Sequence, residues 1–236
     1  MQRLAICVFA LALAAGLAPG AECVPLEPPE GAVVLFDGVG SKDLSQWQRA
    51  RLDDEGRLLA GVTSKAKFAD AVIHLEFIIP PAPEGRRAHG NSGVYIQRRY
   101  EIQILNSHGG KPRSGGCGAI YRYKAADTNA ALEPGTWQSY TIFFREPDWA
   151  EREGKPEKTA DARFTVFHNG VKIHDRVEVS RKTGHGRPEG PEPGPLHLQH
   201  HGWPVAFRNV WVLPVEDEAA ERTAAGLLEK LESGGT

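Results

Sequence analysis

The chain has 236 residues, of which 41% are hydrophobic and 25% charged, ordinary proportions for a soluble globular protein with one sizeable core. Its formal net charge is -2 and no stripe of basic side chains runs along it, which excludes nucleic acid as an expected partner. Beyond the N-terminal segment, no apolar run is long enough for a membrane helix, so we expect no transmembrane segment in the mature chain.

Residues 1–20 are organised like a signal peptide. Arg3 supplies a positive charge, an apolar run follows over residues 4–17, and small residues precede a cleavage site near Gly20. The segment predicts a periplasmic or secreted protein. After its removal Cys23 and Cys117 remain, and outside the cytoplasm these two could form a disulfide.

The rest of the chain consists mainly of short strand patterns separated by turns rich in Gly and Pro. A Pro- and Glu-rich lead-in linker covers residues 21–31. Apolar residues then alternate with polar ones or form short runs. The clearest predicted strands are 33–36, 72–79, 94–96, 100–105, 119–121, 137–144, 164–168, 171–174, 196–199 and 205–213. The charged stretch 145–160 is expected to be a surface loop.

Two local patterns complete the expected fold. Asn169-Gly170 supplies the positive φ angles of a type I′ turn, which predicts a hairpin whose His168 and His174 are decoration rather than ligands. From residue 216 the pattern becomes helical. We therefore predict an all-β fold, an antiparallel β-sandwich of jelly-roll type over residues 32–214, with a short C-terminal helix in a tail over 215–236.

A candidate site begins on the strand that contains Glu101. Tyr100, Ile102 and Ile104 point to one side, toward a core, whereas Glu101 and Gln103 point to the other, roughly 7 Å apart. A carboxylate and an amide on a rigid strand suit a functional site. The plainer interpretation is a solvated outer face of a half-buried strand, and His74 and Glu76 form a similar pair that we expect at a surface or cleft edge.

A second alternating stretch adds imidazole groups. Leu196 and Leu198 face a core, and His197, Gln199 and His201 face away from it. If both stretches lie in one sheet, their polar side chains could converge on one surface. Asn91 comes just before the strand that leads to Glu101 and can join this set.

The length of the turn before Glu101 decides its neighbour. A two-residue loop at Arg98-Arg99 sets Glu101 opposite Ile96, whereas a three-residue loop sets it opposite Tyr95. An apolar partner would be unusual on a polar face.

Several segments of the sequence together resemble the 3-keto-disaccharide hydrolase domain family, whose members have a concanavalin A-like lectin/glucanase jelly roll. The resemblance covers most of residues 32–214. The pieces that carry it are Leu35-Phe36-Asp37-Gly38, Gly90-Asn91-Ser92-Gly93-Val94-Tyr95, Tyr100-Glu101-Ile102-Gln103-Ile104-Leu105, Cys117-Gly118-Ala119-Ile120-Tyr121, Phe167-His168-Asn169-Gly170-Val171, Leu196-His197-Leu198-Gln199 with His201-Gly202, and Phe207-Arg208-Asn209-Val210-Trp211. His200 departs from the family, which often has Asp there, and this puts any role of that Asp in doubt.

The resemblance implies a bacterial exported enzyme that acts on 3-keto-glycosides as carbohydrate substrates. A ketone at C3 acidifies the C2 proton, so a base can remove it while the group at C1 leaves, and water adds later. Glu101 and His201 are the candidate base and acid, in either order. Substrate-binding candidates are Asn91, Gln103, Gln199, Tyr95 and His197.

Three alternatives remain open. Glu101 and His201 could instead hold a divalent cation that polarises the ketone; no other cofactor is expected. The chain could be a non-catalytic saccharide-binding module of the cell envelope, with Tyr95, Tyr123 and Trp203 as aromatic platforms, since fold alone does not assign function. It could also be a structural envelope domain without a ligand.

Overall fold

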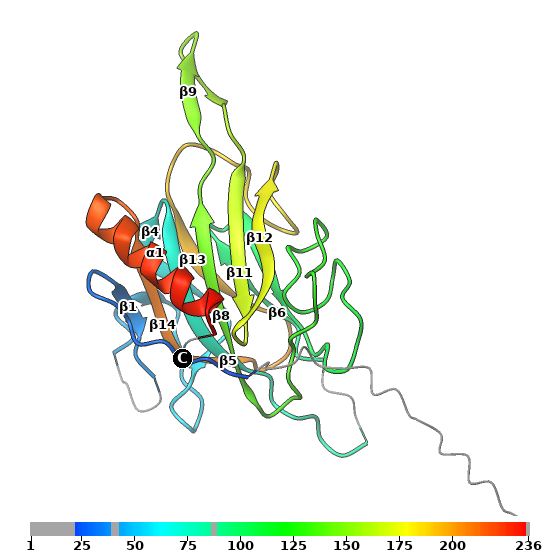
Figure 1. Cartoon of the computed structure of the whole chain (residues 1–236). Coiled ribbons are helices and arrows are strands. Elements are labelled where there is room, and N and C mark those ends of the chain that lie inside the picture. Colours follow the sequence, from blue (N-terminus) through cyan, green and yellow to red (C-terminus); the bar gives the residue numbers. More distant parts are fainter. Residues whose placement is uncertain (1–21, 39–42, 86–88, 235–236) are drawn as a thin grey trace, which may run out of the picture.

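The structure is a computed structural model that describes residues 22–38, 43–85 and 89–234 (Figure 1). The predicted signal peptide lies outside the described residues. The elements are β1 (Val33–Phe36), β2 (Trp47–Gln48), β3 (Leu58–Leu59), β4 (Val62–Phe68), β5 (Ala71–Ile78), β6 (Ser92–Ile96), β7 (Tyr100–Ile104), β8 (Trp137–Arg145), β9 (Trp149–Arg152), β10 (Lys155–Lys158), β11 (Ala162–His168), β12 (Val171–Val179), β13 (Gly194–His200), β14 (Ala206–Pro214) and α1 (Glu218–Glu232).

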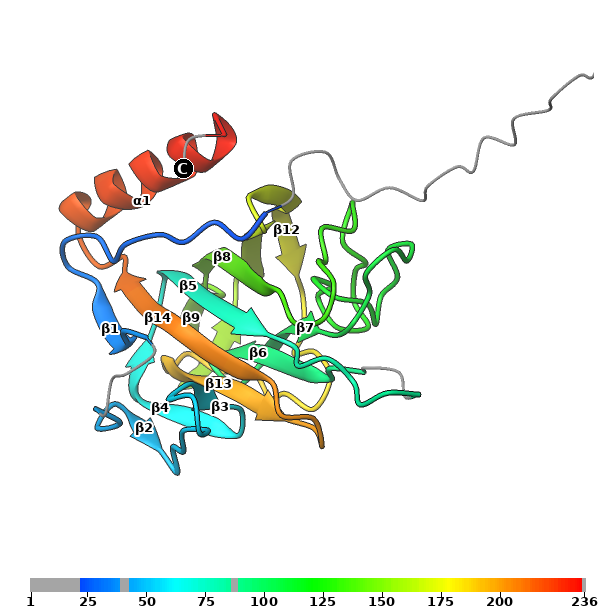
Figure 2. The same ribbon diagram turned by 90° about the horizontal axis from the view of Figure 1, so that it is seen from below.

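Two antiparallel sheets face each other and form a sandwich (Figure 2). The large sheet has the strand order β1-β14-β5-β8-β11-β12, with β3 paired to β14, and the small sheet has the order β2-β4-β13-β6-β7. The predicted antiparallel all-β sandwich of jelly-roll type with a short C-terminal helix is confirmed.

The core lies between the sheets, and the alternation along β7 and β13 explains how it is built. Tyr100, Ile102 and Ile104 of β7, with Leu196 and Leu198 of β13, are buried in one hydrophobic cluster with residues of the large sheet. Successive strand residues point to opposite faces. The residues between them, Glu101 and His197 among them, therefore face outward from the small sheet.

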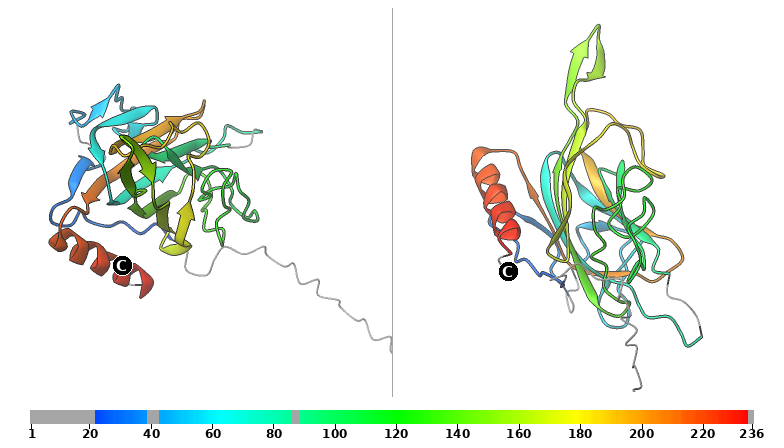
Figure 3. Two further views of the ribbon diagram at one scale, coloured as in Figure 1. Left: turned by 90° about the horizontal axis from the view of Figure 1, so that it is seen from above. Right: turned by 45° about the vertical axis from the view of Figure 1, so that its right-hand side comes forward.

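The segments around the predicted hairpin and the charged insertion take defined forms. β11 and β12 are joined by Asn169 and Gly170, whose φ angles are 53° and 73°, as a type I′ turn requires. The insertion expected to be a loop instead contains the two-stranded β9–β10 hairpin, which extends beyond the sandwich (Figure 3).

The outer face of the large sheet is covered by the lead-in segment and by α1. Val24 and Leu26 of the lead-in are buried with Trp211 of β14 and Leu231 of α1. The side chain of Asp217 caps α1 by accepting the main-chain N–H of Ala220. Among the described residues, no helix has the length and apolar character needed to cross a bilayer.

This cover corrects the expectation for His74 and Glu76. Both are buried, not at a surface or cleft edge, because the lead-in lies over them and the main-chain N–H of Leu26 donates to Nε2 of His74. Glu76 is held by Arg208 at 2.7 Å and by Asn209 at 2.9 Å. A buried carboxylate with these charge-assisted partners serves the fold.

The two cysteines do not form the disulfide that the sequence allowed. Both are free thiols. Cys23 donates to the carboxylate of Glu76 on the outer face of the large sheet, whereas Cys117 is buried beside the Tyr140 hydroxyl, 3.2 Å away, in the core. A layer of sheet therefore separates the partners of the two thiols.

Buried histidines predict that acid destabilises the protein. His168 and His174 are inside the fold and are not surface decoration of the hairpin. Burial lowers the pKa of His74 and His168 to about 3 and that of His174 to about 4. In the unfolded chain a histidine takes up its proton near pH ~6.5, so stability is lost as the pH falls from there toward 4. Melting curves should show a falling Tm over this range, and a constant Tm between about pH 7 and about pH 5 would contradict the prediction.

Candidate active site on the outer face of the small sheet

Strand pairing brings the predicted polar residues into two neighbouring rows. His197 of β13 lies opposite Tyr95 of β6, which lies opposite Glu101 of β7. In the next row, Gln199 and Gln103 lie on either side of Gly93. The two stretches found in the sequence therefore do share one sheet and one face of it.

The turn between β6 and β7 is the three-residue loop of the two considered. Ile96 pairs with Tyr100 and Tyr95 pairs with Glu101, which leaves Gln97, Arg98 and Arg99 in the loop. Gln97 and Arg98 have φ angles of 53° and 55°, which turn the chain tightly. This register gives Glu101 a polar neighbour in place of Ile96.

Glu101 is a nearly buried carboxylate held by specific partners. It is 2% exposed, its Oε2 accepts a 2.6 Å hydrogen bond from the Tyr95 hydroxyl, and its main-chain N–H donates to Oγ1 of Thr183. Burial raises the pKa of Glu101, while the hydrogen bond that Tyr95 donates acts in the opposite direction. A carboxylate with a raised pKa is a stronger base than one in water.

Two glycines make room for this carboxylate. A Cβ at Gly93 would overlap Oε1 of Glu101, and a Cβ at Gly184 would overlap Oε2. Gly184 also has a φ of +51°, which a side chain would strain. The backbone of β6 and of the loop after β12 therefore encloses the Glu101 carboxylate closely.

His201 is linked to the same face through amide side chains. Nδ2 of Asn91 lies 3.1 Å from Nδ1 of His201, and Oδ1 of Asn91 accepts a 3.3 Å hydrogen bond from Nε2 of Gln103. His201 itself is exposed, whereas Gln103 is buried. Within the described residues, Oε1 of Gln103 is buried without a hydrogen-bond partner, which is the kind of orphan atom that a bound ligand satisfies.

The remaining candidates have supporting positions. His197 shares a 2.9 Å hydrogen bond with Thr63, and burial, followed by the charge of Arg98, lowers its pKa to about 4. Tyr95 is only 4% exposed, so its ring does not offer a stacking platform, and its hydroxyl instead positions Glu101. Gln199 is half-buried in the outer-face row.

His200 stands where the resembling family often has Asp. It is exposed at the end of β13, with its Cβ close to Gly61. Alternation along the strand directs it away from the face that carries Gln199 and His201.

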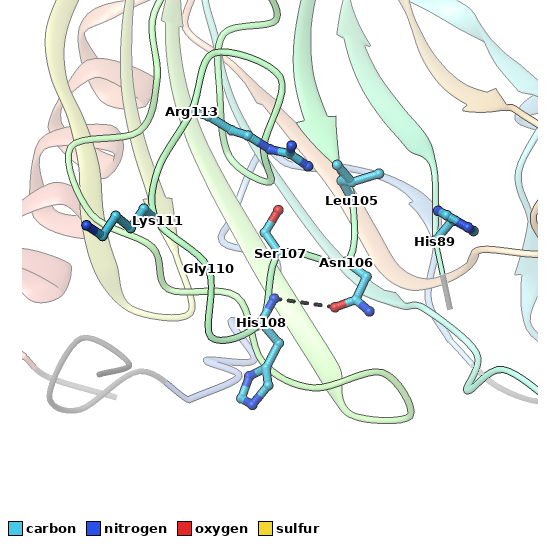
Figure 4. Close-up of a pocket in the computed structure, with 8 residues that line it drawn as sticks. All are labelled: His89, Leu105, Asn106, Ser107, His108, Gly110, Lys111 and Arg113. Atoms are coloured by element: carbon cyan, nitrogen blue, oxygen red, sulfur yellow. Dashed lines mark hydrogen bonds between the residues drawn. The ribbon is translucent and has the colours of Figure 1, made fainter. Parts of the chain in front are cut away.

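Cavities border this face on two sides. One, of about 420 Å³, lies at the end of β7 and is lined by His89, Leu105, Asn106, Ser107, His108, Gly110, Lys111 and Arg113. In Figure 4 the Arg113 side chain extends toward Leu105, whereas the Lys111 side chain points away from both of these residues. A second cavity, of about 400 Å³, adjoins the loop that contains Gly184.

Few ionisable side chains on this face could bind a metal ion. Within the described part of the chain, no three His, Cys, Asp or Glu side chains form a group that could hold a metal ion. A cation between Glu101 and His201 would have these two as its ionisable protein ligands, with amides, water or substrate filling the remaining positions.

Sequence reasoning missed the residues that surround Glu101 from outside its own hairpin. Thr183 and Gly184 lie between β12 and β13, in a stretch whose sequence has no strand pattern. The signal available was Thr183-Gly184-His185-Gly186, where closely spaced glycines mark tight backbone approach. Gly93 was noted only as part of a motif, although it provides the space for the carboxylate.

Comparisons with known proteins concern the family and the fold of the chain. A family model described as 3-keto-alpha-glucoside-1,2-lyase-like domain matches residues 31–213. A Parabacteroides distasonis protein described as a candidate glycosyl hydrolase is 30% identical, with a TM-score of 0.66, over 79% of this chain and 85% of that chain. A second such protein from this organism is 22% identical, with a TM-score of 0.53, over 78% and 99% of the chains. A search of curated proteins finds no match.

Proposed function

The chain belongs to the 3-keto-alpha-glucoside-1,2-lyase-like domain family, and we propose that it is an exported enzyme that cleaves 3-keto-glycosides by elimination across C1 and C2. The observation that carries the proposal is the single enclosed carboxylate of Glu101, with a raised pKa, on the face that also carries His201. Export is supported by the signal-peptide pattern of residues 1–20.

The chemistry needs one base and one acid. A ketone at C3 makes the C2 proton acidic, so the base takes it and the electron pair is held as an enolate with the C3 oxygen. The C1=C2 double bond then forms as the C1–O bond breaks, and the leaving oxygen takes a proton from the acid. The products are an unsaturated 3-keto sugar and a free alcohol, and later addition of water to the double bond gives the net result of hydrolysis.

We assign the base to Glu101. The β7 strand offers one carboxylate, so a displacement that uses two carboxylates on this strand is not available. Efficient proton abstraction needs a base whose pKa is near the working pH. Burial of Glu101 moves its pKa in that direction, and the Tyr95 hydroxyl fixes the orientation of its carboxylate.

We assign the acid to His201. An amide nitrogen only donates hydrogen bonds, so Nδ1 of His201 accepts from Asn91, and the proton of the neutral ring is on Nε2. The orientation of the Asn91 amide follows from the hydrogen bond that Gln103 donates to its oxygen. Nε2 of His201 is then free to donate to the leaving oxygen. Gln103, Gln199 and His197 are assigned to contacts with sugar hydroxyls.

The assignment of His201 predicts a dependence on the leaving group. With an alkyl 3-keto-glucoside, the His201→Ala variant should turn over about 10²-fold or more slowly, because the poor leaving group needs a proton. The nitrophenolate of a nitrophenyl 3-keto-glucoside leaves without a proton. With this substrate the loss of turnover in the His201→Ala variant should nearly vanish. Initial rates of the purified wild-type and variant proteins measure both effects.

The matched control is His108→Ala, an exposed histidine in the loop after β7 that takes no part in the steps above. An equal loss for both leaving groups in the His201 variant would contradict its role as acid. Loss of wild-type turnover with a chelator and recovery with a divalent cation would assign Glu101 and His201 to a cation instead. Binding of saccharides without turnover of any 3-keto-glycoside would favour the binding-module alternative.

A further inference from the structure

The cavity of about 400 Å³ beside Glu101 is lined by side chains that have no role in the proposed elimination. It is lined by Tyr121, Arg122, Tyr123, Arg181, Lys182, Thr183, Gly184 and His185. None of these residues is acidic. Three are permanent cations and two are aromatic, although the whole protein has a net charge of -2.

Residues that line the cavity also surround Glu101. Thr183 accepts the main-chain N–H of Glu101, a Cβ at Gly184 would overlap its Oε2, and the main-chain N–H of Tyr121 donates to its main-chain carbonyl at 2.9 Å. A sugar whose C2 proton lies at Glu101 would therefore extend to the edge of this cavity.

The position of the cavity along β7 indicates which part of a bound substrate would lie in the cavity. Thr183 also donates its main-chain N–H to the carbonyl of Arg99, in the turn just before β7. Asn91 and His201 instead lie toward Gln103, which comes after it. The cavity and His201 are therefore on opposite sides of Glu101, and the cavity lies on the side of the oxidised sugar, away from the leaving group.

Two of the three cations of the cavity pack on aromatic rings. Arg122 lies over the ring of Tyr121 at 5.4 Å and Arg181 over the ring of Tyr123 at 5.1 Å. Among the described residues, no ion pair joins Arg122, Arg181 or Lys182 to an acidic side chain. Their charge is therefore available to an anion.

We propose that this cavity is a subsite for an anionic group, a carboxylate above all, carried by the oxidised sugar or by a residue attached to it. The protein would then prefer acidic 3-keto-glycosides to neutral ones. The inference rests on the proposed function for its placement of the sugar. The guanidinium groups form charge-assisted hydrogen bonds with the anion, and the tyrosine rings pack on the sugar.

The test compares a 3-keto-glucuronide and a 3-keto-glucoside that share one nitrophenyl leaving group. Wild-type kcat/KM should be higher for the acidic substrate, and the preference should shrink as salt is added. The Arg122→Ala/Arg181→Ala variant should lower the acidic-to-neutral ratio by about tenfold to hundredfold. The control is Arg222→Ala/Lys230→Ala, which removes two positive charges from α1, on the far side of the large sheet (Figure 1), and should keep the wild-type ratio.

A binding measurement makes the two proposals separable. Calorimetric titration with the unoxidised nitrophenyl glucuronide and glucoside requires no turnover. Tighter glucuronide binding that is lost in the Arg122/Arg181 variant supports the subsite even if no 3-keto substrate reacts. Turnover of both 3-keto substrates with equal kcat/KM, or the same acidic-to-neutral ratio in wild type and variant, overturns the subsite and leaves the proposed function standing.

Discussion

We expect the Glu101→Gln variant to lose turnover of a 3-keto-glycoside by about 10²- to 10⁴-fold, the range expected for removal of a general base. Glutamine has nearly the shape of glutamate and its Oε1 can accept the hydrogen bond that Tyr95 donates. The change therefore removes proton abstraction and little else. Initial rates with a nitrophenyl 3-keto-glucoside measure the effect, since this substrate does not depend on His201.

The stability of the variant provides the internal control. The pKa of Glu101 is raised in the folded protein, so its contribution to stability is present below its unfolded pKa and lost as the pH rises through the folded value. At neutral pH the glutamine variant should melt at or above the wild-type temperature. The matched Glu76→Gln variant should do the reverse, losing stability because Arg208 loses its partner while kcat is kept. A Glu101→Gln variant that folds and keeps near-wild-type turnover would remove Glu101 from the mechanism.

Gly93→Ala should reduce turnover by about 10²-fold through displacement of the Glu101 carboxylate. The new methyl group would overlap Oε1 and lie 2.9 Å from Cγ of Glu101, so the side chain must move. Gly93 is outside the left-handed region, so alanine adds no backbone strain there. Rates should fall while circular dichroism keeps the wild-type spectrum.

Two comparisons show whether Gly93 acts through Glu101. In the Glu101→Gln background the alanine should cause little further loss, because the group that it displaces no longer acts as a base. Gly226→Ala in α1, where no atom outside the adjoining helix backbone lies within 4 Å of the added carbon, should keep activity and raise stability by about 0.5–1 kcal/mol. Additive losses at positions 93 and 101 would indicate that Gly93 affects the substrate and not the carboxylate.

Alternation along single strands was sufficient to assign the facing of the candidate residues. Tyr100 and Ile102 are in the core and Glu101 faces outward because the period of a strand is two residues. Alternation could not assign the neighbour of Glu101, because that depends on whether the turn has two residues or three. The structure has three, and Tyr95 is the partner.

Burial on the outer faces could not be predicted in the same way. His74 and Glu76 have the alternation of a solvated pair, yet the lead-in segment covers them. Glu101 is likewise enclosed by Thr183 and Gly184, which are more than 80 residues away in the chain. Contacts between segments so distant leave no periodic signal in either one, and they are what raises the pKa of Glu101.

The fate of a deuterium atom at C2 tests the elimination mechanism most directly. A 3-keto-glucoside deuterated at C2 is incubated in ordinary water with wild-type protein, and the sugar product is analysed by mass spectrometry against a sample without enzyme. If Glu101 abstracts the C2 proton, the sugar should lose its deuterium faster with wild-type protein than in the sample without enzyme. With the Glu101→Gln variant, deuterium should be lost at the rate of the sample without enzyme. Cleavage of the C1–O bond with the deuterium still at C2 would contradict the mechanism.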